Sequence, residues 1–188
     1  MSVAVQPISL VEFLQLPETE PTSEYIDGKV VRKMSPKARH SRLQWLITQA
    51  LNNHVRCLQL GEAFPELRCT FAGRSHVYDI AYFRADRIAY GPDGQLVDDV
   101  FLPPDLAVEI LSPGQSSRGA EDKLRWSVRH GVRLGAFIDP YRYRVRLFEP
   151  GARTRTLAEK DSLDGKQVIP GFRLAVKTIF GWLRREAN

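Results

Sequence analysis

The clearest helical pattern in the chain runs from about residue 37 to residue 60. Its apolar side chains recur every three or four residues, at Leu43, Leu46, Ile47, Ala50, Leu51, Val55 and Leu58. This spacing places them on one face of a long helix, which Gly61 is expected to end. A second helix is predicted over residues 118–130, before Gly131. Shorter helices are predicted from a Ser9 cap to about Leu16, and over residues 176–184.

The remaining apolar segments have the pattern of strands. They are predicted at a hairpin over 24–34, at 64–71, 77–83, 105–111, 134–138 and 143–148, with short strands in the tail. Asp27-Gly28 favours a primed two-residue turn in the first hairpin. The nearly continuous apolar character of residues 105–111 indicates a strand that is buried on both faces. Residues 84–103 are expected to form a surface excursion. Together these elements predict an α/β fold with a mixed sheet covered by helices on both faces.

Composition supports a globular chain of this kind. The 188 residues are 43% hydrophobic and 26% charged, and no linker or repeat divides them, which favours a single domain over residues 1–188. No segment approaches the roughly 20 apolar residues that span a bilayer, and the first residues lack the features of a secretory signal. We therefore expect a cytoplasmic protein without a membrane partner, in which Cys57 and Cys69 are buried thiols.

The positive charge of the chain changes this picture only locally. A formal net charge of +5 suits a polyanionic partner but is weak evidence by itself. Six basic residues gather in one short stretch, at Lys29, Arg32, Lys33, Lys37, Arg39 and Arg42. This stretch is either a solvated basic face or a surface that contacts phosphates.

Two acidic residues interrupt strands that are otherwise apolar. Asp79 lies between Tyr78 and Ile80, and Glu109 lies inside the most apolar strand. A carboxylate on a buried strand is costly unless it is paired or binds a cation. The two acids therefore either hold a hard divalent metal, which prefers oxygen ligands, or form separate ion pairs with Arg or Lys at strand ends.

Seven short segments carry a resemblance to a known family. They are Glu24-Tyr-Ile-Asp-Gly-Lys-Val-Val, Met34-Ser-Pro-Lys-Ala-Arg-His40, Tyr78-Asp79-Ile-Ala, Pro104-Asp-Leu-Ala-Val-Glu109-Ile-Leu-Ser-Pro113, Glu121-Asp-Lys123-Leu, Ala136-Phe-Ile-Asp-Pro140 and Pro170-Gly-Phe172. In this order and spacing, over residues 8 to 183, the chain resembles the Uma-type (Uma-two) endonuclease family. That family lies within the PD-(D/E)xK superfamily, whose members have the restriction-endonuclease-like fold.

The resemblance implies a metal-dependent endonuclease that hydrolyses phosphodiester bonds, with DNA as the expected partner. Asp79 and Glu109 would bind Mg²⁺ or Mn²⁺, with the backbone carbonyl of Ile110 as a further ligand. Glu24 would assist in holding the metal or positioning water. Lys123, on the helix after the acidic strand, would orient the nucleophile or stabilise the transition state. From the residues alone, the favoured interpretation of Lys123 is a solvated helix lysine near Glu121 and Asp122. The alternative for Glu24 is a residue on the surface of a strand.

The basic start of the long helix supplies the expected contacts to nucleic acid. Lys37, Arg39 and His40 are assigned to this surface, although His40 alternatively caps the helix. Glu66 is interpreted as peripheral. His54, His76 and His130 have no ligand spacing and are expected at the surface or in hydrogen bonds. A homodimer is a reasonable arrangement, because nucleases of this kind often use two protomers to cut two strands.

The chain also departs from the family pattern. Tyr78 stands where the superfamily has Pro, and Leu111 stands where its lysine usually lies. Gly119 and Ser127 replace the Asp and Tyr that often flank the helix lysine, although Ser127, one turn from Lys123, is placed to substitute in part. These departures keep two alternatives open: a nucleic-acid-binding protein that retains the fold without chemistry, and a hydrolase of another phosphate ester.

Overall fold

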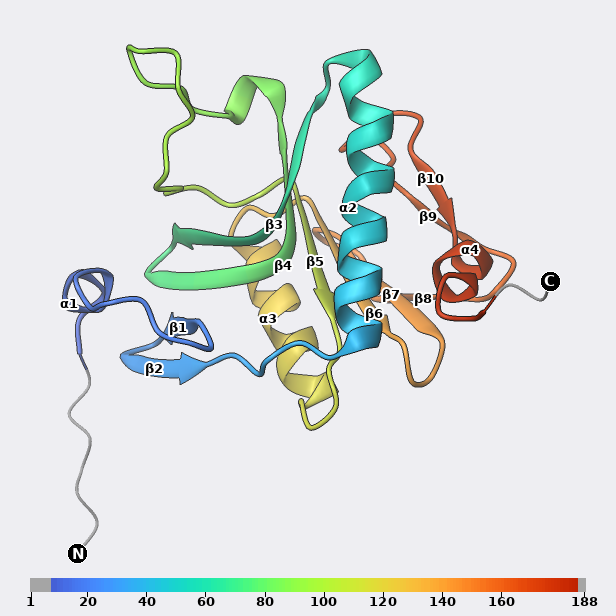
Figure 1. Cartoon of the computed structure of the whole chain (residues 1–188), viewed down its shortest axis with the longest axis horizontal. Coiled ribbons are helices and arrows are strands. Elements are labelled where there is room, and N and C mark those ends of the chain that lie inside the picture. The colour runs from blue at the N-terminus through green and yellow to red at the C-terminus, as the bar shows by residue number, and fades with distance from the viewer. Residues whose placement is uncertain (1–7, 186–188) are drawn as a thin grey trace, which may run out of the picture.

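A computed structural model describes residues 8–185 of the chain, and within them one large mixed sheet lies between helices (Figure 1). The helices are α1 (Leu10–Leu14), α2 (Ala38–Leu58), α3 (Ser117–Arg129) and α4 (Val176–Gly181), with a 3-10 turn at Ala85–Arg87. The strands are β1 (Ser23–Ile26), β2 (Lys29–Arg32), β3 (Gly61–Phe71), β4 (Arg74–Arg84), β5 (Leu106–Ile110), β6 (Leu134–Asp139), β7 (Arg144–Phe148), β8 (Arg155–Leu157), β9 (Ser162–Asp164) and β10 (Arg173–Ala175).

The sheet brings together strands that are distant in sequence. In the described part of the chain its order is β2-β1-β4-β5-β6-β7-β8, and β3 pairs with β4 off this path. Strands β5 and β6 are parallel, with Leu106 opposite Leu134, whereas the other strand pairs of residues 8–185 run antiparallel. A parallel pair needs a crossover, and α3 provides it. The predicted α/β class and mixed sheet are confirmed.

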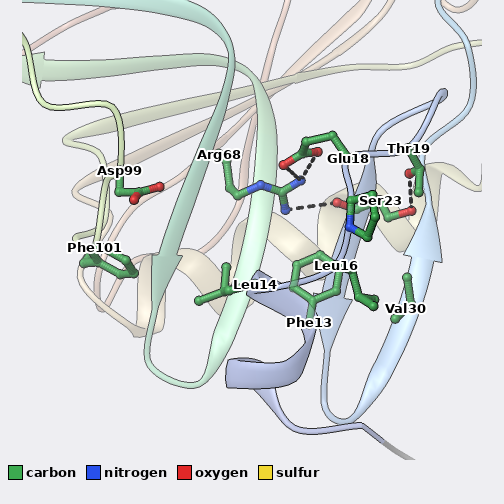
Figure 2. A pocket seen from close by; sticks show the side chains of 11 residues that line it. Phe13, Leu14, Leu16, Glu18, Thr19, Ser23, Val30, Arg68, Asp99 and Phe101 are labelled. Atoms are coloured by element: carbon green, nitrogen blue, oxygen red, sulfur yellow. Dashed lines mark hydrogen bonds and ion pairs between the residues drawn. The ribbon is translucent and has the colours of Figure 1, made fainter.

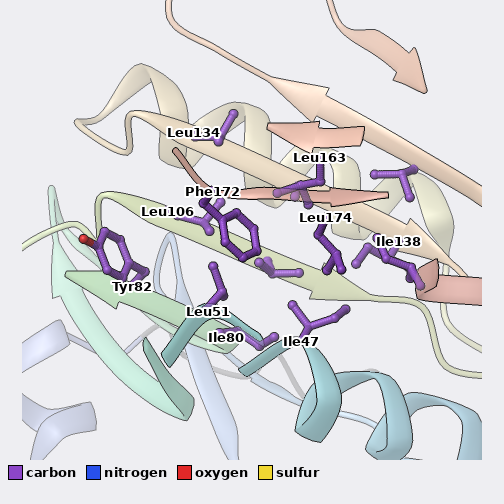
Figure 3. Close-up of a cluster of buried hydrophobic side chains, with 14 of the residues drawn as sticks. Ile47, Leu51, Ile80, Tyr82, Leu106, Leu134, Ile138, Leu163, Phe172 and Leu174 are labelled. Atoms are coloured by element: carbon purple, nitrogen blue, oxygen red, sulfur yellow. The ribbon is translucent and has the colours of Figure 1, made fainter. Parts of the chain in front are cut away.

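Each face of the sheet has its own hydrophobic core. On one face, Ile47 and Leu51 of α2 pack against apolar residues of β4, β5 and β6, and the small β9–β10 sheet closes the cluster (Figure 3). On the other face, Leu124 and Trp126 of α3 pack against a second cluster that includes Phe137. The central strands are therefore buried on both sides, which explains their nearly continuous apolar sequence.

Local chemistry sets the first elements as the sequence predicts. Ser9 caps α1 by accepting from the Glu12 backbone N–H, while the Glu12 carboxylate accepts from the Ser9 backbone. Between β1 and β2, Asp27 and Gly28 have φ angles of 49° and 81°. Two successive positive φ angles are those of a type I′ turn, whose twist matches that of the flanking strands.

Several element ends differ from the predicted ones. Helix α2 ends at Leu58 because Gln59, with φ of 51°, adopts the left-handed conformation that was expected of a glycine. Gly61 instead begins β3, where an added Cβ would lie 2.0 Å from the Phe83 carbonyl oxygen. Strands β3 and β4 are longer than predicted, since their mutual pairing continues past the apolar residues. Helix α4 ends at Gly181, three residues early.

The structure tests the expected burial of the two cysteines and the expected absence of a membrane helix. Both cysteines are free thiols, but only Cys69 is buried, so the expectation for Cys57 was wrong: it lies on the exposed side of α2. No helix within residues 8–185 combines the length and apolar character needed to cross a bilayer.

Candidate active site

The three acids predicted for the site lie on neighbouring strands of the sheet. Glu24 is on β1, Asp79 on β4 and Glu109 on β5, and all three are buried, with exposed fractions of 6%, 2% and 7%. Strand β3 pairs along one edge of β4, whereas β1 and β5 pair with its other edge, at Ser75 and at Ile80–Tyr82. The β4–β5 register places Ile80 opposite Val108, so the next residues along these strands, Asp79 and Glu109, come side by side.

Lys123 joins two of these acids. Its Nζ lies 2.6 Å from Glu24 Oε1, 2.7 Å from Glu109 Oε1 and 2.9 Å from the Val77 carbonyl oxygen. The Val77 backbone N–H also donates to Glu24 Oε1, at 2.8 Å. Lys123 is therefore a buried lysine at the centre of the acids, and the reading of it as a solvated helix residue was wrong. The reading of Glu24 as a surface residue was wrong as well.

Asp79 is held by a different set of partners. Its Oδ1 accepts from Lys33 Nζ at 2.8 Å, and its Oδ2 lies 3.0 Å from His40 Nε2. The Ile110 backbone N–H donates to the same Oδ2 at 2.7 Å. This bond ties Asp79 to the end of β5 next to Glu109. The metal-binding role of the Ile110 carbonyl stays a prediction.

One backbone oxygen connects the two halves of the cluster. The Val77 carbonyl accepts from Lys33 Nζ at 3.0 Å and from Lys123 Nζ at 2.9 Å. Both ammonium groups therefore meet at one point of β4, with Asp79 on one side and Glu24 and Glu109 on the other. The acids do form ion pairs, as the alternative interpretation held, but these pairs belong to one shared cluster.

The pKa values of the three acids are shifted in different directions. Burial alone would raise the pKa of Glu24 and of Asp79, but the neighbouring lysines and hydrogen bonds prevail. Lys123 holds the pKa of Glu24 well below its usual range, and Lys33 does the same for Asp79. Burial raises the pKa of Glu109 to about 8 against the pull of Lys123, and the charge of Asp79 adds to the rise. Glu109 is thus the last of the three acids to ionise.

The lysines keep their charge in this setting. Burial would lower the pKa of Lys123, but the carboxylates of Glu109 and Glu24 raise it well above its usual range. In the same way the Asp79 carboxylate outweighs burial and raises the pKa of Lys33. The site therefore holds two ammonium groups among three carboxyl groups, which is a strongly polar arrangement for the interior of a sheet.

A cleft of about 530 Å³ opens onto one side of this cluster. Its lining comes from the segments 20–22 and 33–36, from α2 and from β3 and β4, and includes Lys33, His40, Gln44, Glu66 and Asp79. Glu24, Glu109 and Lys123 are not among its lining residues. A substrate in the cleft therefore reaches Asp79 and Lys33 first.

A second, smaller hollow of about 140 Å³ lies beside α1 (Figure 2). Phe13 and Leu16 line it, and Arg68 crosses it to bond Glu18 and the Ser23 carbonyl. None of the predicted site residues lines this hollow.

Sequence reasoning missed three members of the site. Lys33 was one of six basic residues in a stretch, and nothing in that stretch distinguishes it; the structure turns it inward just after β2. Glu66 was interpreted as peripheral, but its Oε2 lies 3.1 Å from Lys33 Nζ and its Oε1 accepts from Gln44 at 2.8 Å. His76 is fully buried without a hydrogen-bond partner, 3.8 Å from Glu24 Oε2, contrary to expectation.

The start of α2 places the residues assigned to nucleic acid. Lys37 and Arg39 are exposed, and Arg39 lies over the ring of Tyr141 at 5.3 Å. His40 does not cap the helix, because the N-cap is Lys37 and no side chain bonds there. His40 is instead buried against Asp79 at the edge of the cleft. The contacts of all three residues with phosphate stay predictions.

The sequence matches the model of a known protein family over most of its length. The model of the Uma2 family, described as “Putative restriction endonuclease”, matches residues 10–177. The chain belongs to the Uma2 family. A crystal structure from Anabaena variabilis, described as a putative nuclease of DUF820, is similar to the chain with a TM-score of 0.91 and 36% sequence identity. The similarity covers 95% of this chain and all of that one. No curated protein matches the chain.

Two residues that depart from the family pattern, Tyr78 and Ser127, contact each other beside Lys123. Ser127 Oγ donates to the Lys123 carbonyl oxygen at 2.8 Å and lies 2.6 Å from the Tyr78 hydroxyl. The Tyr78 ring lies beside the Lys123 ammonium, with 4.8 Å between Nζ and the ring centroid. An aromatic ring therefore flanks the lysine from β4 rather than from the helix. Ser127 acts on the helix backbone and on Tyr78, and not on the ammonium group as expected.

The chemistry of these residues fits a hard divalent cation. Glu24, Asp79 and Glu109 supply carboxylate oxygens, and the Val77 carbonyl adds a backbone oxygen between them. Glu109 Oε1 is buried without a hydrogen-bond partner, although it faces Lys123. Within residues 8–185 no three His, Cys, Asp or Glu side chains are grouped closely enough to hold a metal ion by themselves. The carboxylates and backbone carbonyls would supply the oxygen ligands that such an ion prefers.

Proposed function

We propose that this Uma2-family chain is a metal-dependent endonuclease that hydrolyses phosphodiester bonds in DNA. The observation that supports this function is one buried network beside an open cleft, in which Lys33 and Lys123 share the Val77 carbonyl and contact acids of three strands: Glu24, Asp79 and Glu109. Structural frameworks rarely bury three carboxyl groups and two lysines together, because each buried charge costs free energy.

Each residue of the cluster would have its own role in catalysis. Asp79 and Glu109 would hold Mg²⁺ or Mn²⁺, with Glu24 as a third acid and the Ile110 carbonyl as a further oxygen. The bound ion would polarise a phosphoryl oxygen and lower the pKa of an attacking water. Lys123 keeps Glu24 and Glu109 together, and the Ile110 N–H fixes the orientation of Asp79. The same Uma2 assignment, together with a net charge of +5, supports nucleic acid as the substrate.

Cleavage of supercoiled plasmid tests this proposal directly. Wild type is expected to nick or linearise plasmid in Mn²⁺ or Mg²⁺ and to do nothing in EDTA. Asp79→Asn and Glu109→Gln keep the shapes of the side chains and should each reduce the rate at least 100-fold. Glu159→Gln, which changes an exposed acid, is the matched control and should leave the rate unaltered. Equal rates for wild type and Glu109→Gln would contradict the proposal.

One observation favours a second function, binding without chemistry. The acids are already balanced by Lys33 and Lys123, and a chain that kept only the fold would have this arrangement. Such a protein would bind DNA in a salt-sensitive manner and would show no turnover in any metal. RNA and small phosphodiesters, tested beside plasmid, separate this outcome from a hydrolase of another phosphate ester.

The expected homodimer belongs to the same proposal. A dimer would present two acid clusters to the two strands of a duplex. Light scattering of the purified protein, alone and with a short duplex, measures the mass of the assembly. A linear product without an accumulated nicked intermediate would indicate that both strands are cut in one encounter.

A further inference from the structure

The two lysines of the acid cluster, Lys33 and Lys123, differ in their access to the cleft. Lys33 lines the 530 Å³ cleft together with Asp79 and Glu66, whereas Lys123 is not among the lining residues. The ammonium group of Lys123 is enclosed by Glu24, Glu109 and the Val77 carbonyl. A phosphate that enters the cleft therefore meets the Lys33 ammonium before that of Lys123.

The bonds of Lys33 also differ in how readily they can be exchanged. An ammonium group has three donors, and Lys33 directs them at Asp79 Oδ1 (2.8 Å), the Val77 carbonyl (3.0 Å) and Glu66 Oε2 (3.1 Å). The first two acceptors are buried parts of β4. The Glu66 side chain is 44% exposed and makes the longest of the three bonds. Glu66 is thus the acceptor that a phosphate oxygen can replace.

The backbone at Glu66 supports a special role for this position. Glu66 has a φ of 49° within β3, a conformation that is costly for a residue with a side chain. The β3–β4 register runs through Pro65 and Leu67 without a Glu66–Asp79 pair. This conformation turns the Glu66 carboxylate toward Lys33 and Gln44 at the cleft wall.

We propose that Lys33 is a catalytic residue of this nuclease, contacting a non-bridging oxygen of the scissile phosphate after that oxygen displaces Glu66. Lys123 then holds Glu24 and Glu109 in place and does not touch the substrate. This assignment rests on the proposed nuclease function. In the reaction, water forms a new bond to phosphorus and gives up a proton to solvent, while one ester P–O bond breaks and its leaving oxygen takes up a proton from solvent. Lys33 donates a hydrogen bond to the charge that develops on the phosphate and keeps its proton throughout.

The first test compares Lys33→Met with wild type in plasmid cleavage. The rate constant is expected to fall about 100- to 1000-fold, as it does when one donor to a transition-state charge is removed. Affinity for a short duplex in Ca²⁺ should fall less than tenfold, and the thermal unfolding midpoint should confirm that the variant folds. Lys160→Met, which alters an exposed lysine remote from the described contacts of the cluster, is the control.

Chemical rescue separates a catalytic lysine from a structural one. Lys33→Ala leaves a space that opens to the cleft, so added ethylamine should restore cleavage at least tenfold. Lys123→Ala leaves an enclosed space and should gain nothing from the amine. Lys33→Arg, which keeps the charge on a longer side chain, should retain more activity than Lys33→Met.

Glu66 provides an independent readout that does not depend on turnover. If phosphate displaces its carboxylate from Lys33, Glu66→Gln should bind duplex several-fold more tightly in Ca²⁺. Unaltered affinity would contradict the exchange of Glu66 for phosphate.

The outcomes distinguish this assignment from the function on which it rests. If wild type cleaves DNA and Lys33→Met cleaves it equally fast, the assignment of Lys33 is wrong and the nuclease function stands. If wild type cleaves nothing in any metal, the nuclease function fails and the assignment fails with it.

Discussion

Lys123 Nζ lies 2.6 Å from Glu24 Oε1, although 99 residues separate the two along the chain. The contact joins α3 to β1, and the same ammonium group lies 2.7 Å from Glu109 Oε1 and donates to the Val77 carbonyl. A buried charge that loses its partner destabilises a protein far more than an intact pair stabilises it. The fold around the acid cluster therefore depends on this lysine.

The first prediction concerns that dependence. Lys123→Met should lower the free energy of unfolding by about 3–5 kcal/mol, because it leaves the Glu24 carboxylate buried without its cation. Adding Glu24→Gln to this variant should recover part of the loss. Urea denaturation measures both, with Lys160→Met as the exposed control. A Lys123→Met variant as stable as wild type would show that these contacts contribute little.

The second prediction is a dependence of stability on pH. The folded chain holds the Glu109 proton up to a pKa of about 8, whereas an ordinary glutamate loses it near 4.5. The contribution of this proton to stability is therefore fully present below about pH 4.5 and is lost as the pH rises toward 8. Glu109→Gln keeps a neutral side chain throughout this range.

Wild type should consequently lose stability relative to Glu109→Gln between pH 5 and pH 9. The difference in Tm is expected to grow over this range, by about 2–4 °C for each kcal/mol of lost stability in a chain of this size. Thermal unfolding in metal-free buffers measures it, with Glu159→Gln following wild type. A constant difference between wild type and Glu109→Gln would place the Glu109 pKa near its ordinary value.

The sequence predicted the architecture well because the relevant signals are local or repetitive. The continuous apolar sequence of residues 105–111 is that of a buried strand. Asp27 and Gly28 are residue types that readily adopt the positive φ angles of a tight hairpin turn. The acid positions were found for a related reason: a carboxylate inside an apolar strand stands out. Those signals require no knowledge of distant contacts.

The partners of the acids could not be found in this way. Lys33 and Asp79 are 46 residues apart, and their contact depends on how β2 leads into α2. The inward turn of Lys33 has no signature among its basic neighbours. Likewise, the positive φ of Glu66 is set by the pairing of β3 with β4 rather than by its own preference. Such features arise from tertiary packing.

A third prediction addresses the contact between Tyr78 and Ser127. Tyr78→Phe removes the hydroxyl that lies 2.6 Å from Ser127 Oγ and keeps the ring beside Lys123. The expected loss is about 1 kcal/mol, because Ser127 retains its bond to the Lys123 carbonyl. A double-mutant cycle with Ser127→Ala should give a coupling energy of similar size. Additive effects would show that the two hydroxyl groups do not interact.

A fourth prediction concerns the basic start of α2. Lys37 and Arg39 are exposed there, at the end of the segment that borders the cleft. If each contacts a DNA phosphate, Lys37→Gln and Arg39→Gln should weaken binding of all sequences alike. Each should reduce the slope of log K against log salt by about 0.9. Lys160→Gln is the control, and slopes equal to that of wild type would assign these residues to a solvated face.

The central claim is that acids from β1, β4 and β5 together hold a divalent metal, and titration with Mn²⁺ followed by electron paramagnetic resonance tests it most directly. Wild type is expected to bind one Mn²⁺ at the cluster, and Asp79→Asn and Glu109→Gln should each weaken that binding at least tenfold. Glu159→Gln should bind as wild type does. Equal Mn²⁺ affinity in wild type, Asp79→Asn and Glu109→Gln would contradict the account.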